Sequence, residues 1–308
     1  MRLVTRYDFD GLVCAVLLEE LGIVDEYQFA HPKDIQDGRV LVTERDVLAN
    51  VPYVPGCGLW FDHHASEADR IGLGEGFEYE GRACPAPSCA RVIYEYYGGE
   101  QKFARFDQSG LMAAVDAYDS ADLTVEQVLE PTGWILLASL VDPRSNIEVA
   151  SSFRTSGHQF MRDLIGYCRT MRIEDILALA DVRERAVHYL QQQKGYMTML
   201  RRHSRAEGNV IVIDLRCVDE LLSGSRFIEY ALYPDQNVSV RCFWGKDRQN
   251  VVFSVGHSII NRTCRIDIGR LMLSHGGGGH RRVGSCQVRV EDADRVMGEI
   301  LEKLQAGH

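Results

Sequence analysis

Acidic and imidazole side chains follow three short apolar runs in the first half of the chain. The runs are residues 3–5, 40–43 and 59–61, and the groups that follow them are Asp8 and Asp10, then Asp46, then Asp62, His63 and His64. We expect each run to be a buried strand of one parallel sheet, because open α/β sheets place ligands beyond the carboxyl ends of their strands. The pattern therefore predicts one polar site at that edge of the sheet.

The residue types in this set indicate a divalent metal ion. Asp8 and Asp10 are two residues apart, and Gly11 lets the chain turn tightly into a helix. Asp116 and Asp119 are three residues apart on a predicted helix and share one face. Carboxylate-rich sites with few imidazoles suit Mn²⁺ or Mg²⁺ better than zinc, and two such ions about 3.5–4 Å apart can activate water against a phosphate. We therefore predict bound Mn²⁺, one ion or two, with Mg²⁺ as the alternative.

A second group of candidates lies in the other half of the chain. It consists of Gly276, Gly277, Gly278, Gly279 and His280, with Arg281 and Arg282 next to them. The glycine amides could form a nest for an anion, so we expect a glycine-rich loop that contacts the substrate. Arg226 and Arg262 are further candidates for substrate contacts, and Phe227 could stack on a base. Each of these three could equally be a surface arginine or a core aromatic residue.

The elements that would position these residues form two domains of an α/β fold. The first domain, residues 1–190, is predicted to hold the parallel sheet, helices at 11–21, 88–97, 108–119 and 132–141, and one long helix at 173–202. The second, residues 205–308, is predicted to be a smaller mixed α/β domain with strands at 210–213, 238–244, 251–255 and 286–290 and helices at 268–274 and 292–304. We expect the active site in a cleft between them.

Composition narrows the location and the partners of the protein. No apolar run approaches the roughly 18 residues of a membrane span, and nine cysteines without a CxxC pair indicate reduced thiols, so we expect a cytoplasmic protein. Residues 1–150 carry 11 Lys and Arg against 26 Asp and Glu, which argues against binding to long duplex DNA. An acidic surface that only maintains solubility is the alternative explanation. Residues 151–308 carry 23 Lys and Arg against 18 Asp and Glu, and this more basic half could hold an anionic substrate.

These motifs resemble the DHH phosphoesterase family, which includes RecJ-like exonucleases, oligoribonucleases, exopolyphosphatase-related proteins and manganese-dependent pyrophosphatases. The matching positions are residues 5–11, Asp46, residues 62–64, Asp116 and residues 276–280, in family order. The resemblance implies a catalytic DHH domain followed by a DHH-associated substrate-binding domain, and a homodimer by analogy. It implies metal binding by Asp8, Asp10, Asp46, His63 and Asp116. Asp46 would bridge two ions, His64 would contact the substrate phosphate, and Asp62 would orient a histidine.

Arg6 departs from the family pattern, which usually has histidine at this position. A guanidinium stays protonated and cannot donate a lone pair to a metal. Arg6 could leave the first metal site weakened, place a positive charge near the substrate phosphate, or neutralise surplus carboxylates. Asp119 is an open alternative to Asp116 as the fourth-motif ligand.

The sequence therefore predicts a phosphoesterase for small nucleotidic substrates, namely short oligonucleotides, dinucleotides or nucleoside bisphosphates. The glycine-rich motif favours the nuclease branch of the family. The alternatives are an exopolyphosphatase or inorganic pyrophosphatase, which would act on a polyphosphate substrate, and a nucleotide-binding sensor that lacks catalysis.

Overall fold

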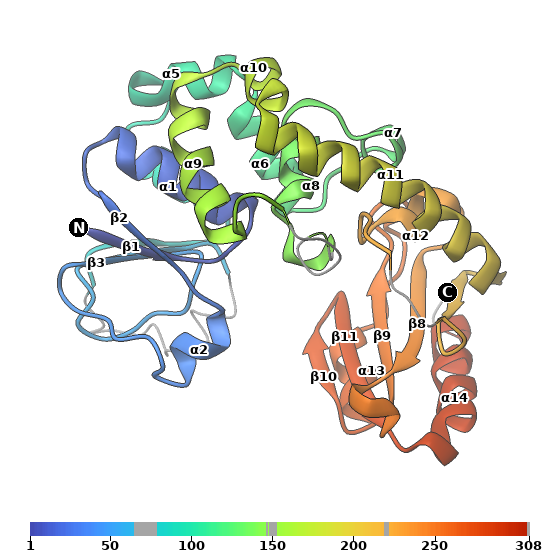
Figure 1. The fold of residues 1–308 in the computed structure, drawn as a ribbon. Coiled ribbons are helices and arrows are strands. Elements are labelled where there is room, and N and C mark those ends of the chain that lie inside the picture. The colour runs from blue at the N-terminus through green and yellow to red at the C-terminus, as the bar shows by residue number, and fades with distance from the viewer. Residues whose placement is uncertain (65–78, 146, 148–152, 219–221, 307–308) are drawn as a thin grey trace. The chain divides into compact units, whose positions relative to one another are not determined.

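The protein was analysed as a computed structural model in which residues 1–64, 79–145, 147, 153–218 and 222–306 are described. The chain forms two compact units. The first contains residues 1–122 and 131–189, and the second contains residues 123–130 and 190–308. Each unit has its own sheet, and helix α11 (Ala180–His203) runs from one unit into the other (Figure 1).

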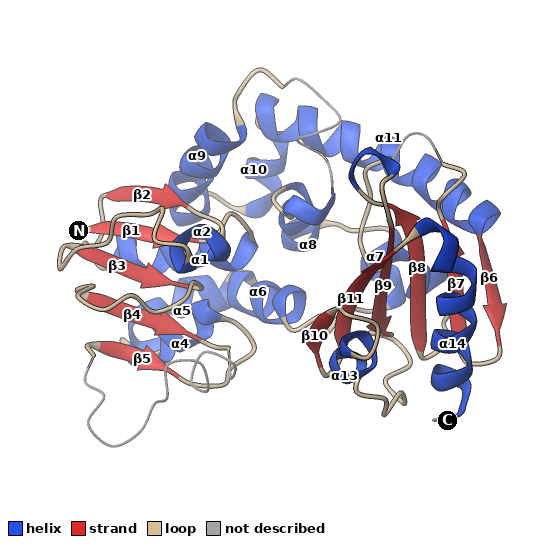
Figure 2. Cartoon of the chain, turned by 90° about the horizontal axis from the view of Figure 1, so that it is seen from below, coloured by secondary structure: helices blue, strands red, loops and turns tan. Residues whose placement is uncertain are grey.

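The sheet of the first unit has five strands, and every neighbouring pair is parallel (Figure 2). In spatial order the strands are β2 (Glu26–Phe29), β1 (Arg2–Thr5), β3 (Asp46–Ala49), β4 (Leu59–Asp62) and β5 (Gly81–Ala83). The predicted α/β class with a parallel first sheet is thus confirmed. The carboxyl ends of β1, β3 and β4 lie side by side, which brings the residues after them together.

One predicted strand is wrong. Residues 40–43 form no strand, and Leu41 is 79% exposed, because the apolar run lies in a surface segment. The buried strand at this place is β3, which begins at Asp46 and ends before Asn50. In the register of the sheet Asp46 is opposite Arg2, and Ala49 is opposite Thr5. Asp46 therefore lies at the amino end of its strand rather than the carboxyl end.

The helices of the first unit pack mainly on one face of this sheet. They are α1 (Phe9–Glu20), α2 (Pro32–Gln36), α4 (Cys89–Tyr96), α5 (Glu100–Gln108), α6 (Leu111–Asp119), α8 (Gly133–Leu140), α9 (Gly157–Thr170) and α10 (Ile173–Ala178). Figure 1 shows α1, α6 and α9 on one side of the sheet and the short α2 on the other. Helix α1 is apolar on all sides and buried, as expected of a helix in the middle of a layer.

Two predicted helices differ in the structure. The helix expected at 108–119 is α6, which begins only after Gly110 with its left-handed φ of 78°, and the preceding helix α5 was not predicted. Leu179 is extended (ψ 143°), so the segment expected as one helix at 173–202 is α10 followed by α11. Within the described residues no helix is both long enough and apolar enough to span a membrane.

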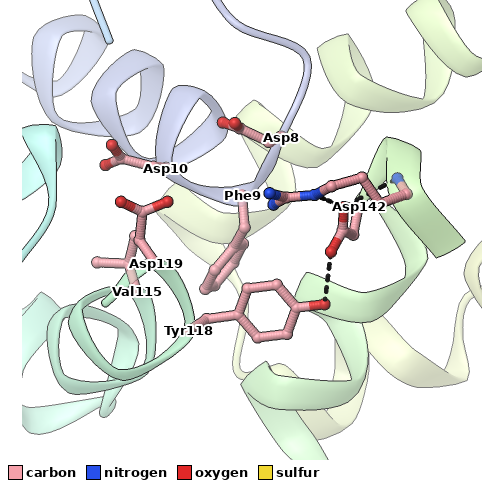
Figure 3. A pocket seen from close by; sticks show the side chains of 8 residues that line it. Asp8, Phe9, Asp10, Val115, Tyr118, Asp119 and Asp142 are labelled. Atoms are coloured by element: carbon pink, nitrogen blue, oxygen red, sulfur yellow. Dashed lines mark hydrogen bonds and ion pairs between the residues drawn. The ribbon is translucent and has the colours of Figure 1, made fainter. Parts of the chain in front are cut away.

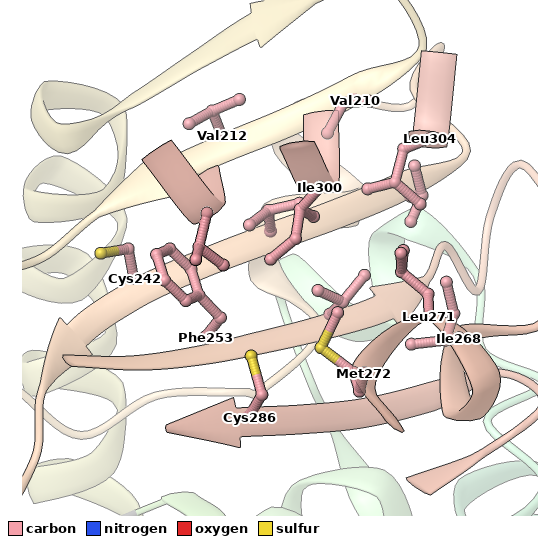
Figure 4. Close-up of a cluster of buried hydrophobic side chains, with 14 of the residues drawn as sticks. Val210, Val212, Cys242, Phe253, Ile268, Leu271, Met272, Cys286, Ile300 and Leu304 are labelled. Carbon is pink, nitrogen blue, oxygen red and sulfur yellow. The ribbon is translucent and has the colours of Figure 1, made fainter. Parts of the chain in front are cut away.

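The second unit is a mixed sheet of six strands with helices on it. In spatial order the strands are β10 (Gly278–His280), β11 (Val283–Val288), β9 (Val251–His257), β8 (Val238–Trp244), β7 (Val210–Asp214) and β6 (Ser204–Glu207), and only β7 and β8 are parallel. The helices are α7 (Val125–Leu129), α12 (Ile228–Leu232), α13 (Ile268–Leu273) and α14 (Ala293–Ala306). Figure 4 shows the hydrophobic core of this unit, in which Phe253 of β9 belongs to one cluster with Ile300 of α14 and Met272 of α13.

Candidate metal centre

Asp10 is anchored by backbone amides. Its side chain is buried, and its two oxygens accept hydrogen bonds from the N–H groups of Cys89 (2.9 Å) and Ala90 (2.8 Å), the first two residues of α4. The amino end of a helix favours negative charge there. Burial raises the pKa of Asp10 well above its ordinary value, and the charges of Asp119 and Asp8 raise it further, while the two amides lower it. The site thus concentrates negative charge that a bound cation would relieve.

His63 presents a free ring nitrogen to this carboxylate. Its Nδ1 lies 3.2 Å from the carbonyl oxygen of Ala86, which can only accept, so Nδ1 is a donor and the neutral form of the imidazole has its lone pair on Nε2. Nε2 is buried without a hydrogen-bond partner among the described residues, 3.3 Å from Asp119 and 3.8 Å from Asp10. One ligand atom from each of these three residues lies within 4.8 Å of the others. Two carboxylates and one imidazole with an orphaned nitrogen fit a divalent metal ion.

Of the two aspartates on α6, Asp119 lies next to His63 and Asp10, whereas Asp116 is paired elsewhere. One oxygen of Asp116 accepts from the Ser88 hydroxyl (2.7 Å), and the other accepts from Nε (2.9 Å) and Nη2 (2.6 Å) of Arg91. Asp116 therefore braces α6 against α4, and this contact does not favour the predicted role of Asp116 as a metal ligand. Because the two residues lie three apart on one helical face, their spacing could not choose between them.

The predicted role of Asp46 as a bridging metal ligand does not fit its position in the sheet. Its carboxylate accepts from the Arg2 guanidinium at 2.7 and 2.9 Å and from the backbone N–H of Thr43 at 2.7 Å, at the amino edge of the sheet. Burial raises the pKa of Asp46, but the bonds from Arg2 and Thr43 outweigh it and lower the pKa overall. Because Asp8 and Asp10 follow the opposite end of β1, Asp46 cannot bridge ions bound by them.

Asn50 occupies the place at the carboxyl end of β3 where Asp46 was expected. It is buried in a left-handed conformation (φ 56°), and its Nδ2 donates to Asp8 at 3.1 Å. An amide side chain gives no signal in a search for carboxylates. The prediction of a strand at 40–43 also directed attention away from the residue that follows the real strand.

Asp8 is held by three groups. Its Oδ1 accepts from the Gly11 amide (2.9 Å) and from Asn50, and its Oδ2 lies 3.0 Å from Nε of Arg6. Burial raises the pKa of Asp8, and the charge of Arg6 partly counteracts that rise. The turn requires Gly11, because a Cβ there would lie 2.1 Å from the carbonyl oxygen of Arg6. Asp8 thus caps α1 and pairs with Arg6.

Asp62 orients His64. Nδ1 of His64 lies 2.8 Å from Oδ1 of Asp62, whose side chain is 1% exposed, while the imidazole itself is 43% exposed. Burial lowers the pKa of His64, but the hydrogen bond and charge of Asp62 outweigh it and raise the pKa. The pairing leaves Nε2 of His64 available to donate towards an anion.

A pocket connects several of these groups with residues that the sequence did not single out. It is lined by Asp8, Phe9, Asp10, Val115, Tyr118, Asp119, Asp142 and Arg144. In Figure 3 the carboxylates of Asp8, Asp10 and Asp119 lie on one side, and the Tyr118 hydroxyl donates to Asp142 (3.3 Å) on the other. Asp142 and Arg144 follow the buried helix α8. A polar turn directly after an apolar helix is the sequence feature that could have indicated these two residues as part of the site.

The glycine motif of the second unit is more ordered than predicted. The amides of Gly276 and Gly277 donate to Leu273 (3.0 Å) and Met272 (2.9 Å) at the end of α13. Gly278 begins strand β10, so the predicted glycine-rich loop extends only to Gly277. A Cβ on Gly277 would lie 2.0 Å from the Ser285 carbonyl oxygen, which explains glycine there by packing. His280 ends β10 and is exposed.

The two candidate arginines of the second unit have structural contacts. The guanidinium of Arg226 lies 4.3 Å from the ring centroid of Phe227, and Phe227 is buried, so the suggestion that Phe227 stacks on a base is wrong. Arg262 is exposed, and its Nε donates to the Ile259 carbonyl at 2.9 Å. Substrate binding by Arg226, Arg262 and residues 276–280 stays a prediction.

The first unit thus carries buried carboxylates and a histidine pair at the carboxyl edge of a parallel sheet. The structure is similar to that of the pGpG-specific phosphodiesterase PggH from Vibrio cholerae, with a TM-score of 0.89 and 43% identity over 100% of this chain and 99% of that one. It is also similar to the DHH domain of a protein described as a member of a family of ribosomal proteins (TM-score 0.59, 13% identity, 99% and 86% coverage), which shows a shared fold. No family model and no curated protein matches the chain.

The chain belongs to the DHH phosphoesterase family. Identity of 43% over the full length of both chains establishes this relationship. The predicted family and the predicted class of hydrolase, which acts on ester bonds, are confirmed.

Proposed function

We propose that the protein hydrolyses the internal phosphodiester of linear dinucleotides, with pGpG as the first substrate to test. The observation that carries this proposal is the full-length similarity at 43% identity to a pGpG-specific phosphodiesterase. Action on small nucleotides agrees with the sequence prediction. In the reaction the oxygen of water bonds to phosphorus, the 3′-oxygen leaves with a proton, and pGpG becomes two GMP molecules.

Mn²⁺ is the ion that we propose for Asp10, His63 and Asp119, with Mg²⁺ as the alternative. A bound divalent ion would supply positive charge to the phosphate and favour deprotonation of the attacking water. The chain's own contribution is to hold the ligands in place, Asp10 through two helix amides and His63 through Ala86. His64, oriented by Asp62, is placed to donate from Nε2 to a phosphate oxygen.

We further propose a cytoplasmic location and contacts from the second unit to the nucleotide. All nine cysteines are free, which supports a reducing compartment. His280, Gly278, Arg226 and Arg262 are the residues proposed to contact substrate. A homodimer remains a proposal to be tested by light scattering.

One panel of substrates tests the proposed function. Purified protein with Mn²⁺ is given pGpG, a longer oligoribonucleotide, a nucleoside bisphosphate, pyrophosphate and polyphosphate, and the products are separated by chromatography. We expect GMP from pGpG at the highest rate. Release of orthophosphate from pyrophosphate or polyphosphate alone would contradict the proposal and favour a pyrophosphatase. Tight binding of pGpG with no product would instead indicate a sensor.

A variant pair ties the activity to this site. His63→Ala removes the orphaned imidazole nitrogen, and we expect loss of turnover. His31→Ala is the matched control, because His31 only caps the short helix α2 at the surface. Equal loss in both variants would show that the activity is not located at the proposed centre.

A further inference from the structure

Two arginines lie around Asp8 in the first unit. Nε of Arg6 is 3.0 Å from Oδ2 of Asp8. Arg144 lines the same pocket as Asp8, Asp10 and Asp119. Two permanent cations thus stand next to the carboxylates that would surround the reacting phosphate.

Arg144 is oriented before any ligand arrives. Oδ1 of Asp142 accepts from the backbone N–H of Arg144 and from its Nε, both at 2.9 Å. Asp142 is 3% exposed, and the Tyr118 hydroxyl donates to its other oxygen. The Arg144 side chain is 42% exposed, and its two terminal nitrogens make no hydrogen bond to the part of the chain that the structure describes. Those nitrogens remain available to an anion.

Asp8 and its neighbours are poorly suited to a second metal ion. One oxygen of Asp8 accepts from Gly11 and Asn50, and the other is paired with the guanidinium of Arg6, whose positive charge would repel a metal ion. The oxygens of Asp10, in contrast, accept only from neutral backbone amides. Asn50, next to Asp8, donates a hydrogen bond from its amide nitrogen, whereas a carboxylate at this position could bind a metal ion. The guanidinium of Arg6 has no lone pair and cannot bind a metal ion. The positive charge on this side of the pocket therefore comes from guanidinium groups.

We propose that Arg6 and Arg144 bind the non-bridging oxygens of the reacting phosphate and take the place of a second metal ion. The proposal rests on the proposed function, because it needs a phosphate ester as substrate. Guanidinium groups form two parallel hydrogen bonds to phosphate oxygens and stabilise charge that builds up there during attack. Asp8 and Asp142 act as positioning residues, since each holds one of the arginines through Nε.

Turnover and metal content of Arg144 variants test this inference. In Arg144→Ala we expect kcat for pGpG to fall by about 100-fold, as for loss of one preorganised donor to a developing charge. We expect metal content, measured by elemental mass spectrometry, to stay at one ion per chain. Arg144→Lys keeps the positive charge but lacks the paired N–H donors of the guanidinium, so it should recover part of the lost kcat. The matched control is Arg39→Ala, which removes an exposed, ion-paired arginine outside the pocket and should leave kcat unchanged.

Two results would overturn the proposal. They are two bound ions per chain in the wild type, or a kcat in Arg144→Ala within about threefold of the wild type. Thermal unfolding shows whether each variant is folded. If Arg144→Ala is unfolded, Arg144→Lys replaces it in the test. A lower kcat in Arg144→Lys then supports the proposal, and an unchanged kcat overturns it.

A binding titration separates this inference from the proposed function. Calorimetry with inorganic phosphate on the metal-loaded protein should give an affinity at least about 10-fold weaker in Arg6→Ala and in Arg144→Ala than in Arg39→Ala. If the wild type hydrolyses no dinucleotide but this difference is found, the proposed function fails and the arginine site stands. If the wild type hydrolyses pGpG and the three affinities are equal, the arginine site fails.

Discussion

At the scale of single residues, the centre is built from side chains that use one atom for anchoring and leave another for a ligand. His63 uses Nδ1 on a backbone carbonyl and leaves Nε2, and Arg144 uses Nε on Asp142 and leaves its terminal nitrogens. His64 does the same with Asp62. A ligand therefore meets groups that are already oriented, which reduces the free energy needed to arrange them on binding.

The assignment of Asp119 can be tested against the two aspartates that the motif pattern favoured. We expect Asp119→Asn to lower the metal content of the purified protein strongly, since an amide oxygen is a much weaker ligand than a carboxylate. Asp46→Asn and Asp116→Asn should keep the metal, because both residues are occupied by arginines away from His63. Asp46→Asn should cost about 1 kcal/mol in unfolding free energy by weakening the Arg2 pair. Elemental analysis measures the metal content, and thermal unfolding measures the change in stability.

A result in which Asp46→Asn loses its metal while staying folded would restore the bridging role that the geometry rejects. Loss of metal from a folded Asp116→Asn variant would restore Asp116 as a metal ligand. Each substitution changes one oxygen to nitrogen, so the three variants differ little in size.

Much of the centre could be predicted from residue types alone. Asp8, Asp10 and the 62–64 run were found because acids and imidazoles after apolar strands carry an obvious signal. Asn50 and Arg144 were missed, since an amide and an arginine gain meaning only from what they contact. The choice between Asp116 and Asp119 also needed the contact with Arg91, which no spacing reveals.

At the scale of elements, strand ends and helix starts decide which residues meet. The strand at 40–43 was mispredicted because its apolar composition matched that of a buried strand, although the segment lies at the surface. Strands β1, β4, β8 and β9 were predicted well, since their apolar character coincides with burial on the sheet. Helix breaks at Gly110 and Leu179 depend on packing and were not predictable from periodicity.

The glycine motif of the second unit separates into structural and available positions. A Cβ on Gly277 would meet backbone at 2.0 Å, whereas a Cβ on Gly278 meets nothing within 4 Å. We expect Gly277→Ala to destabilise the protein by about 1–3 kcal/mol, as overpacking does. Gly278→Ala should leave the melting temperature unchanged and raise KM for pGpG if this strand approaches the nucleotide. An unchanged KM in Gly278→Ala would count against substrate contact at this position.

At the scale of the whole molecule, the acidic first half and the buried carboxylates of the first unit have a common consequence. Residues 1–150 have 15 more acidic than basic groups, and burial raises the pKa of both Asp8 and Asp10. Keeping these groups ionised in the interior costs folding free energy, and a cation bound only to the folded state offsets that cost.

Removal of the metal should therefore lower the stability of the protein as well as its activity. At a free ion concentration 100 times the dissociation constant, binding adds about 2.7 kcal/mol. For a unit of this size that corresponds to roughly 5–10 °C in melting temperature. Calorimetry with a chelator, then with Mn²⁺ or Mg²⁺ restored, measures the shift for each ion. His63→Ala should show little response to either ion, and a full response in that variant would place the ion elsewhere.

The amides of Cys89 and Ala90 that hold Asp10 carry a consequence for how this enzyme tolerates mutation. Every residue except proline supplies the same N–H, so truncation of the Cys89 side chain to alanine leaves the donor in place. Proline is ordinarily well accepted at the first position of a helix, which is where Cys89 stands, but here it would delete a donor to Asp10. An alanine scan would therefore pass over the anchor of the metal centre, and a proline substitution at Cys89 is the change that would reveal it.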